Sequence, residues 1–126
     1  MNLKTVFKIQ GVILIISGLV PTISADSFLQ MNEMADINQG MLVLARGFGI
    51  MLISMGVIVF RIPNWVGNHL REPAIVAGLI NTAFVLHLGY DINAGHIGGA
   101  SAIVNLIIVL VFAIIFFVLG ARHQNS

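Results

Sequence analysis

The sequence predicts an all-α membrane protein, a polytopic four-helix bundle with both termini on the cytoplasmic side of the membrane. Of its 126 residues, 58% are hydrophobic and only 9% are charged, whereas about a quarter of the residues of a soluble domain are charged. The apolar residues gather in four stretches, each near the roughly 20 residues that a helix needs to cross a bilayer. Because these stretches nearly exhaust the chain, we expect one transmembrane domain over residues 1–126 and no separate soluble domain.

The first predicted span covers residues 6–24 and is opened by the basic residues Lys4 and Lys8. A basic start, a short apolar core and small residues before Asp26 also match a secretory signal peptide, which is removed from a mature protein. We favour a helix that is retained. A cleaved signal peptide over residues 1–25 remains the alternative.

Residues 25–40 form the only markedly acidic stretch of the chain. Its acidic residues are Asp26, Glu33 and Asp36. Ser27 and Gln30 have the spacing of a capping box and predict a short helix. Because its polar and apolar side chains would lie on separate faces, we expect this segment outside, on the membrane surface. The alternative is a second span that begins early and projects beyond the lipid.

The second predicted span covers residues 41–62 and carries small residues at Ala45, Gly49 and Gly56, with one charge at Arg46. Small residues at helical spacing let the backbones of two membrane helices approach closely. The Gly49/Gly56 face is therefore a candidate for self-association or for contact with other membrane-protein subunits. Glycine is also common in spanning helices that have no such role.

The third and fourth predicted spans cover residues 73–90 and 100–119, joined by a glycine-rich turn over residues 91–99. Pro73 suits the first turn of a helix, where an N–H donor is not needed. Asn81 lies near the middle of the third span, and we expect its amide to bond to a neighbouring helix.

The basic residues near the helix ends predict the orientation, because lysine and arginine stay in the cytoplasm. With four spans, five of the six basic residues fall on one side and none falls in the opposite loops. These five are Lys4, Lys8, Arg61, Arg71 and Arg122. We therefore expect both termini and the loop over residues 63–72 in the cytoplasm, with Trp65 at the level of the headgroups.

Arg46 is the most informative polar residue, because an ionised side chain inside a span costs several kcal/mol unless it is paired or hydrated. It lies about 7 Å below the outer end of its helix by helical rise. His87 on the third span and Ser101 and Asn105 on the fourth reach similar depths. Asp91 follows His87 by one helical turn. We therefore expect these five residues to form one polar cluster near the outer surface.

This cluster has two interpretations. It forms an outward-opening pocket for a small polar or anionic ligand, or for the headgroup of a quinone or lipid. Alternatively, Arg46 pairs with Asp91 and locks the bundle, while His87 and Asn105 form hydrogen bonds between helices. The short distance from Arg46 to the surface favours the structural interpretation.

Several chemistries lack the residues they require. The chain has no cysteine, which excludes disulfides and thiolate chemistry. His87 and His96 lack the further ligands of a closed metal site. There is no phosphate-binding glycine loop, no HExxH or GxSxG motif, and no basic patch suited to nucleic acid. We predict no catalytic residue, no metal, no cofactor and no nucleic-acid partner.

Two segments resemble the DoxX-like superfamily of small four-helix bacterial membrane proteins, in particular a branch without an assigned activity. LARGFGIMLISMGVIVF (Leu44 to Phe60) is similar to the arginine-then-glycine second helix of that family. HLGYDINAG (His87 to Gly95) is similar to the end of its third helix and the turn that follows. The resemblance implies a bacterial inner-membrane bundle, and some members of the superfamily are associated with quinone-linked oxidoreductases.

The function that these patterns favour is a non-enzymatic one. We expect a small multi-pass protein of the bacterial inner (plasma) membrane that serves as an accessory or small-ligand-binding subunit of a membrane complex. A small oligomeric transporter or channel is the first alternative. A subunit of a quinone-linked oxidoreductase is the second.

Overall fold

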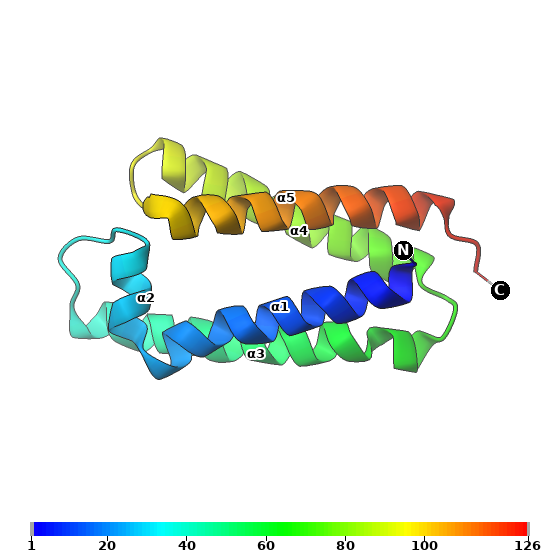
Figure 1. The fold of residues 1–126 in the computed structure, drawn as a ribbon, viewed down its shortest axis with the longest axis horizontal. Helices are drawn as coiled ribbons and strands as arrows, with labels where there is room; N and C mark the ends of the chain where they lie inside the picture. The colour runs from blue at the N-terminus through cyan, green and yellow to red at the C-terminus, as the bar shows by residue number, and fades with distance from the viewer. Residues whose placement is uncertain (1, 126) are drawn as a thin grey trace.

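The computed structural model describes residues 2–125 and shows an elongated bundle of helices (Figure 1). Every regular element within these residues is a helix. The helices are α1 (Leu3–Ile23), α2 (Ala25–Met31), α3 (Gln39–Val66), α4 (Arg71–Asn93) and α5 (Gly99–Arg122). Apart from α2, each is long and apolar enough to cross a membrane. The prediction of an all-α fold with four spanning helices is therefore confirmed.

The helices extend beyond most of the predicted ends. α3 runs past the predicted 41–62 on both sides, because Asn38 caps its first turn by accepting a hydrogen bond from the Met41 N–H at 3.0 Å. At the other end α3 continues through Pro63 and stops at Gly67, which has a φ of 61°. The predicted loop over 63–72 is therefore too long, since polar residues at the interface join the helix.

The acidic segment contains the predicted short helix, but not the predicted capping box. α2 begins at Ala25 after Ser24, so Ser27 lies inside the helix, and Gln30 donates instead to the Asp26 carboxylate at 2.9 Å. α2 and α3 are separate helices, which rules out an early start of the second span. α2 folds onto the bundle, where Leu29 is buried together with Ala45 of α3.

α1 and α3 form an antiparallel pair whose backbones touch at two glycine crossings. A Cβ added to Gly11 would lie 2.7 Å from the carbonyl oxygen of Gly56, and one added to Gly18 would lie 2.5 Å from that of Gly49. Close packing at Gly49 and Gly56 is thus confirmed, but the partner is α1 of the same chain. This face is occupied within the bundle and is not free for self-association. Its use also favours retention of α1 over cleavage of a signal peptide.

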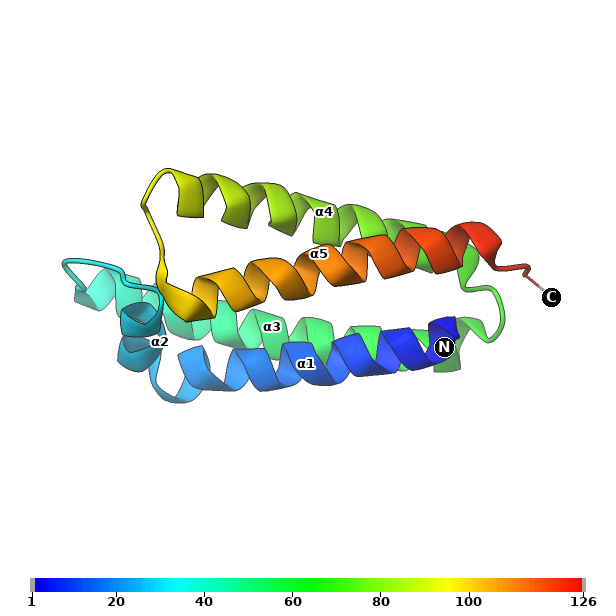
Figure 2. The same ribbon diagram turned by 45° about the horizontal axis from the view of Figure 1, so that its top comes forward.

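α4 and α5 form the second pair, as Figure 2 shows. The two pairs meet mainly through α1 and α5, where the rings of Phe7 and Phe116 lie 4.8 Å apart. Leu70 in the α3–α4 connection is fully buried in the same cluster. This contact is at the end of the bundle that carries both termini (Figure 1).

Most of the charges are sorted between the two ends of the bundle, and Glu72 in the first turn of α4 is the acidic exception at the basic end. At the end of the bundle that carries both chain termini, the four long helices carry the basic residues Lys4, Lys8, Arg61, Arg71 and Arg122. The opposite end comprises α2, the α2–α3 loop, the last turn of α4 and the α4–α5 loop. It carries Asp26, Glu33, Asp36 and Asp91. We call these the basic end and the acidic end.

The glycine crossings predict a stability difference between two chemically identical substitutions. In Gly56→Ala the new methyl group would meet the Gly11 carbonyl oxygen at 2.6 Å and Ile15 Cγ1 at 2.7 Å, so we expect a loss of about 1–3 kcal/mol from overpacking. Gly47→Ala has nothing within 4 Å and should be neutral, or more stable by up to about 1 kcal/mol through helix propensity. Thermal unfolding in mild detergent, followed by circular dichroism, measures both. Equal melting temperatures would contradict the crossing.

Candidate functional site

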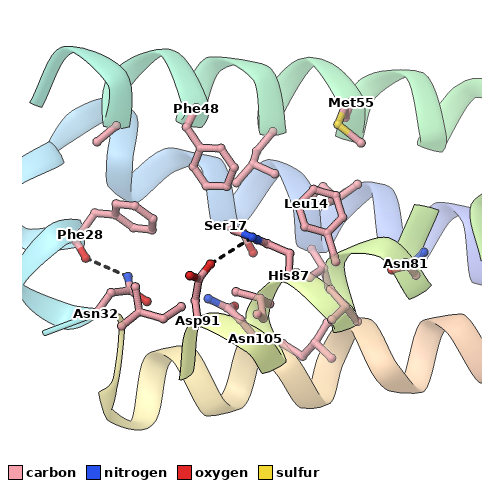
Figure 3. Close-up of a pocket in the computed structure, with 18 of the residues that line it drawn as sticks. Leu14, Ser17, Phe28, Asn32, Phe48, Met55, Asn81, His87, Asp91 and Asn105 are labelled. Carbon is pink, nitrogen blue, oxygen red and sulfur yellow. Dashed lines mark hydrogen bonds and ion pairs between the residues drawn. The ribbon is translucent and has the colours of Figure 1, made fainter. Parts of the chain in front are cut away.

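A cavity of about 540 Å³ lies between the α1/α3 pair and the α4/α5 pair. Its size is within the range of roughly 300–1,000 Å³ that is typical of small-molecule sites. Most of its wall is aliphatic or aromatic, and Leu14, Phe48 and Met55 are among the side chains that face it (Figure 3). The cavity exists because each pair packs tightly within itself, while the two pairs touch at a few places, chiefly the aromatic cluster near the basic end.

The basic end of the cavity is closed by the aromatic contact between the pairs. Phe112 lines the cavity, and its ring stacks obliquely on Phe116 with centroids 6.1 Å apart. Phe7 and Leu70 lie behind Phe116 and are both fully buried. These side chains separate the cavity from the charged groups at the basic end.

Two buried amide side chains in the cavity wall, Gln10 of α1 and Asn81 of α4, join these two helices by a hydrogen bond. The side-chain N–H of Gln10 donates to the Asn81 carbonyl oxygen at 3.0 Å, and Asn81 donates in turn to the Ala77 carbonyl at 2.8 Å. Gln10 is 7% exposed and Asn81 is 5% exposed. The expected role of Asn81 in a hydrogen bond between helices is confirmed. Its partner Gln10 was not singled out by the sequence.

Asp91 holds two histidines at the acidic end of the cavity. Its carboxylate oxygens lie 3.1 Å from His87 Nδ1 and 2.8 Å from His96 Nδ1. An ionised carboxylate only accepts hydrogen bonds, so each imidazole must carry its proton on Nδ1. In a neutral ring, Nε2 is then a free acceptor. Figure 3 shows the His87 ring beside the Asp91 carboxylate, among the residues that line the cavity.

Asn32, at the end of α2, places a further polar group beside this cluster. Its side-chain N–H donates to the Phe28 carbonyl at 2.9 Å, and its backbone carbonyl accepts from the Gly98 N–H at 2.9 Å. Asn32 is only 6% exposed and lines the cavity. Among residues 2–125, its side-chain oxygen has no hydrogen-bond partner.

The structure brings three of the five predicted site residues to the cavity. His87, Asp91 and Asn105 line it, while Ser101 is half-buried on α5 outside the lining. Arg46 is exposed on α3 and also lies outside it. Within the described chain, the carboxylate of Asp91 pairs with histidines rather than with Arg46, so the predicted Arg46–Asp91 lock is wrong.

The physical reason for the error at Arg46 is rotation about the helix axis. Its neighbour Ala45 faces the bundle and is 5% exposed. Successive residues of a helix are turned by about 100°, so Arg46 points away from the cavity. The depth of a residue along a span follows from residue counting, whereas the direction in which its side chain points depends on the helices that pack against the span.

Sequence reasoning also passed over His96 and Asn32. His96 was considered only as a metal ligand, yet it bonds to Asp91. Asn32 falls in a segment expected to lie outside the bundle. Within residues 2–125, no group of three or more His, Cys, Asp or Glu side chains is arranged to hold a metal ion.

Comparisons with known protein families, with curated proteins and with solved structures found no match for this chain. The resemblance to the DoxX-like superfamily therefore stays a prediction.

Proposed function

We propose that this chain is a non-enzymatic membrane protein that binds a small, largely apolar molecule between its two helix pairs, as a ligand-binding or accessory subunit. The observation that carries the proposal is the cavity of about 540 Å³. Pockets that bind small molecules are concave and mostly apolar, with a few polar groups that orient the ligand. Here those groups are the amide pair at Gln10 and Asn81 and the cluster around Asp91.

The shape of the cavity supports binding rather than passage across the membrane. A channel or carrier for polar solutes needs polar groups along its whole path. Beyond the Gln10–Asn81 pair the space ends at Phe112, Phe116 and the core behind them. A ligand that enters from the acidic end therefore meets a closed apolar wall.

We also propose that the basic end faces the cytoplasm of a bacterium, with the acidic end outside the inner membrane. The basic side chains at the ends of all four long helices support this orientation. The ligand would then enter the cavity from the outer side.

Photolabelling tests whether the cavity is occupied. With the protein in lipid vesicles, a diazirine derivative of dodecanol should form adducts on cavity residues such as Leu14 and Phe84. Met55→Trp places a bulky ring in the cavity, and we expect it to lower this labelling about tenfold, a change of about 1.4 kcal/mol. Peptide mass spectrometry locates and quantifies the adducts.

Val57→Trp is the matched control for that experiment. Val57 is on the same helix, is 49% exposed and does not line the cavity, so its replacement should leave the labelling unchanged. Adducts confined to outward-facing side chains, with no effect of Met55→Trp, would refute the proposal.

Native mass spectrometry in mild detergent tests the role as a subunit. We expect the chain, purified from its own membrane at native expression, to retain a second protein component, because its many exposed apolar side chains offer surface for one. A solitary monomer under conditions that preserve other membrane complexes would rule out a stable subunit, while leaving ligand binding intact.

Cysteine labelling tests the orientation. Because the chain has no native cysteine, only the introduced residue can react. In intact spheroplasts, an impermeant maleimide should label Ser27→Cys in α2 but not Asn68→Cys in the α3–α4 connection. In inverted vesicles the pattern should reverse. Labelling of both positions from the same side would contradict the single span, α3, that separates them.

A further inference from the structure

The acidic end of the cavity is rich in hydrogen-bond acceptors. An ionised carboxylate has about four lone-pair sites, and His87 and His96 use one on each oxygen of Asp91. With the two rings neutral, their Nε2 atoms are acceptors as well. Asp91 remains 20% exposed, so a small donor can still reach its carboxylate.

Asn32 adds an acceptor that the protein itself does not use. Its side-chain oxygen has no partner among residues 2–125, although the residue is more than nine-tenths buried and lines the cavity. Within the described residues no buried side-chain oxygen or nitrogen lacks a partner, so this oxygen is accessible, and a donor bound in the cavity can reach it. Figure 3 places Asn32, Asp91 and Asn105 at the same end of the cavity.

Acidic side chains outnumber basic ones at this end. Asp91 is the ionisable acid of the lining, and no lysine or arginine of residues 2–125 lines the cavity. Asp26, Glu33 and Asp36 surround the same end, and Arg46 is the one basic side chain near them within the described residues. With His87 and His96 neutral, an anionic head such as a carboxylate or phosphate would find no counter-charge in the cavity and would face the carboxylate of Asp91.

We infer that the ligand is a lipophilic primary amine, whose ammonium group binds between Asp91 and Asn32 while its alkyl tail fills the cavity. This inference rests on the proposed function and specifies its ligand class. A primary ammonium is charged at neutral pH and carries three N–H donors and no acceptor, as lysine does. It therefore complements a site that offers a negative charge and acceptors. An alcohol supplies one donor and no charge, and a quaternary ammonium supplies charge but no donor.

The depth of the cavity accommodates the tail of such a molecule. Asp91 and Asn81 are both on α4 and face the cavity. Ten residues separate them, which is about 15 Å along the helix, close to the length of an extended dodecyl chain. Leu14, Met55 and Phe84 line the space between these depths. A tail of this length reaches the amide pair without passing the aromatic closure.

Competition for the photolabelled cavity tests the head group. The competitors share one tail and differ only in their heads: dodecylamine, dodecyltrimethylammonium, dodecanol and dodecanoate. In vesicles of zwitterionic lipid we expect dodecylamine to displace the label at roughly tenfold lower membrane concentration than dodecanol, as a charge-assisted hydrogen bond requires. Dodecyltrimethylammonium should be weaker than dodecylamine, and dodecanoate weakest.

Substitutions test whether the preference for dodecylamine over dodecanol arises from Asp91 and Asn32. Asp91→Asn should bring dodecylamine to within about twofold of dodecanol, since the contribution of the charge is lost. Asp36→Asn makes the same change in charge at an exposed residue outside the cavity lining, and should keep the preference. Asn32→Ala removes the unused acceptor and should lower the preference about threefold. If Asp91→Asn fails to fold, which thermal unfolding in detergent will show, Asn32→Ala still tests the amine assignment.

The outcomes separate the inference from the proposed function. If all four competitors displace the label equally, the cavity binds apolar molecules but the amine assignment is overturned. Equal losses in Asp91→Asn and Asp36→Asn would also overturn it, because diffuse surface charge would then explain the preference. If dodecylamine and dodecyltrimethylammonium displaced the label at the same concentration, hydrogen bonds from the ammonium group would be excluded as the source of the preference. If no competitor displaces the label, or no label enters the cavity, the proposed function fails as well.

Discussion

The rest of the structure depends on the backbone contact between α1 and α3. In lipid, two apolar helices gain little by hiding from their surroundings, so close van der Waals packing has to hold them together. The glycines of both helices repeat after seven residues, and the antiparallel pairing of Gly11 with Gly56 and of Gly18 with Gly49 uses both repeats. This spacing brings the same face of each helix to the contact twice, about 10 Å apart along the pair.

Because α1 and α3 pack on each other, α4 and α5 form a second pair, and the cavity is the space left where the surfaces of the two pairs do not touch. Aromatic bulk joins them near the basic end, where Phe7 meets Phe116. Toward the acidic end, contact is made instead by the backbone bond from the Gly98 N–H to the Asn32 carbonyl. Asn32, at the end of α2, thus connects the two helix pairs at the acidic end. The same residue also lines the cavity.

The sequence predicted the elements well because run length and hydropathy are local properties. It also identified Gly49 and Gly56 as a packing face, although it could not name the partner, since Gly11 and Gly18 become complementary only once the chain has turned back on itself. The site was predicted less completely. His87, Asp91 and Asn105 were found from their depth, but Arg46 and Ser101 share that depth and do not line the cavity. Which way a residue faces is set by tertiary packing, which a single span does not reveal. His96 and Asn32 lie in loops or at helix ends, where no periodicity indicates facing.

The polarity of the cavity changes along its length in a way that limits what it can hold. The amide pair of Gln10 and Asn81 is buried, with one hydrogen bond between the two side chains and another to the backbone of α4. Such groups are neutral, and in a low-dielectric setting they are stable because they bond to each other. Asp91, in contrast, lies beside two histidines that are 63% and 59% exposed, so its charge stays close to water. A charged group that moved from Asp91 to the depth of Asn81 would lose both water and counter-charge. The charge of any ligand is therefore confined to the acidic end, and only its apolar part can extend inward.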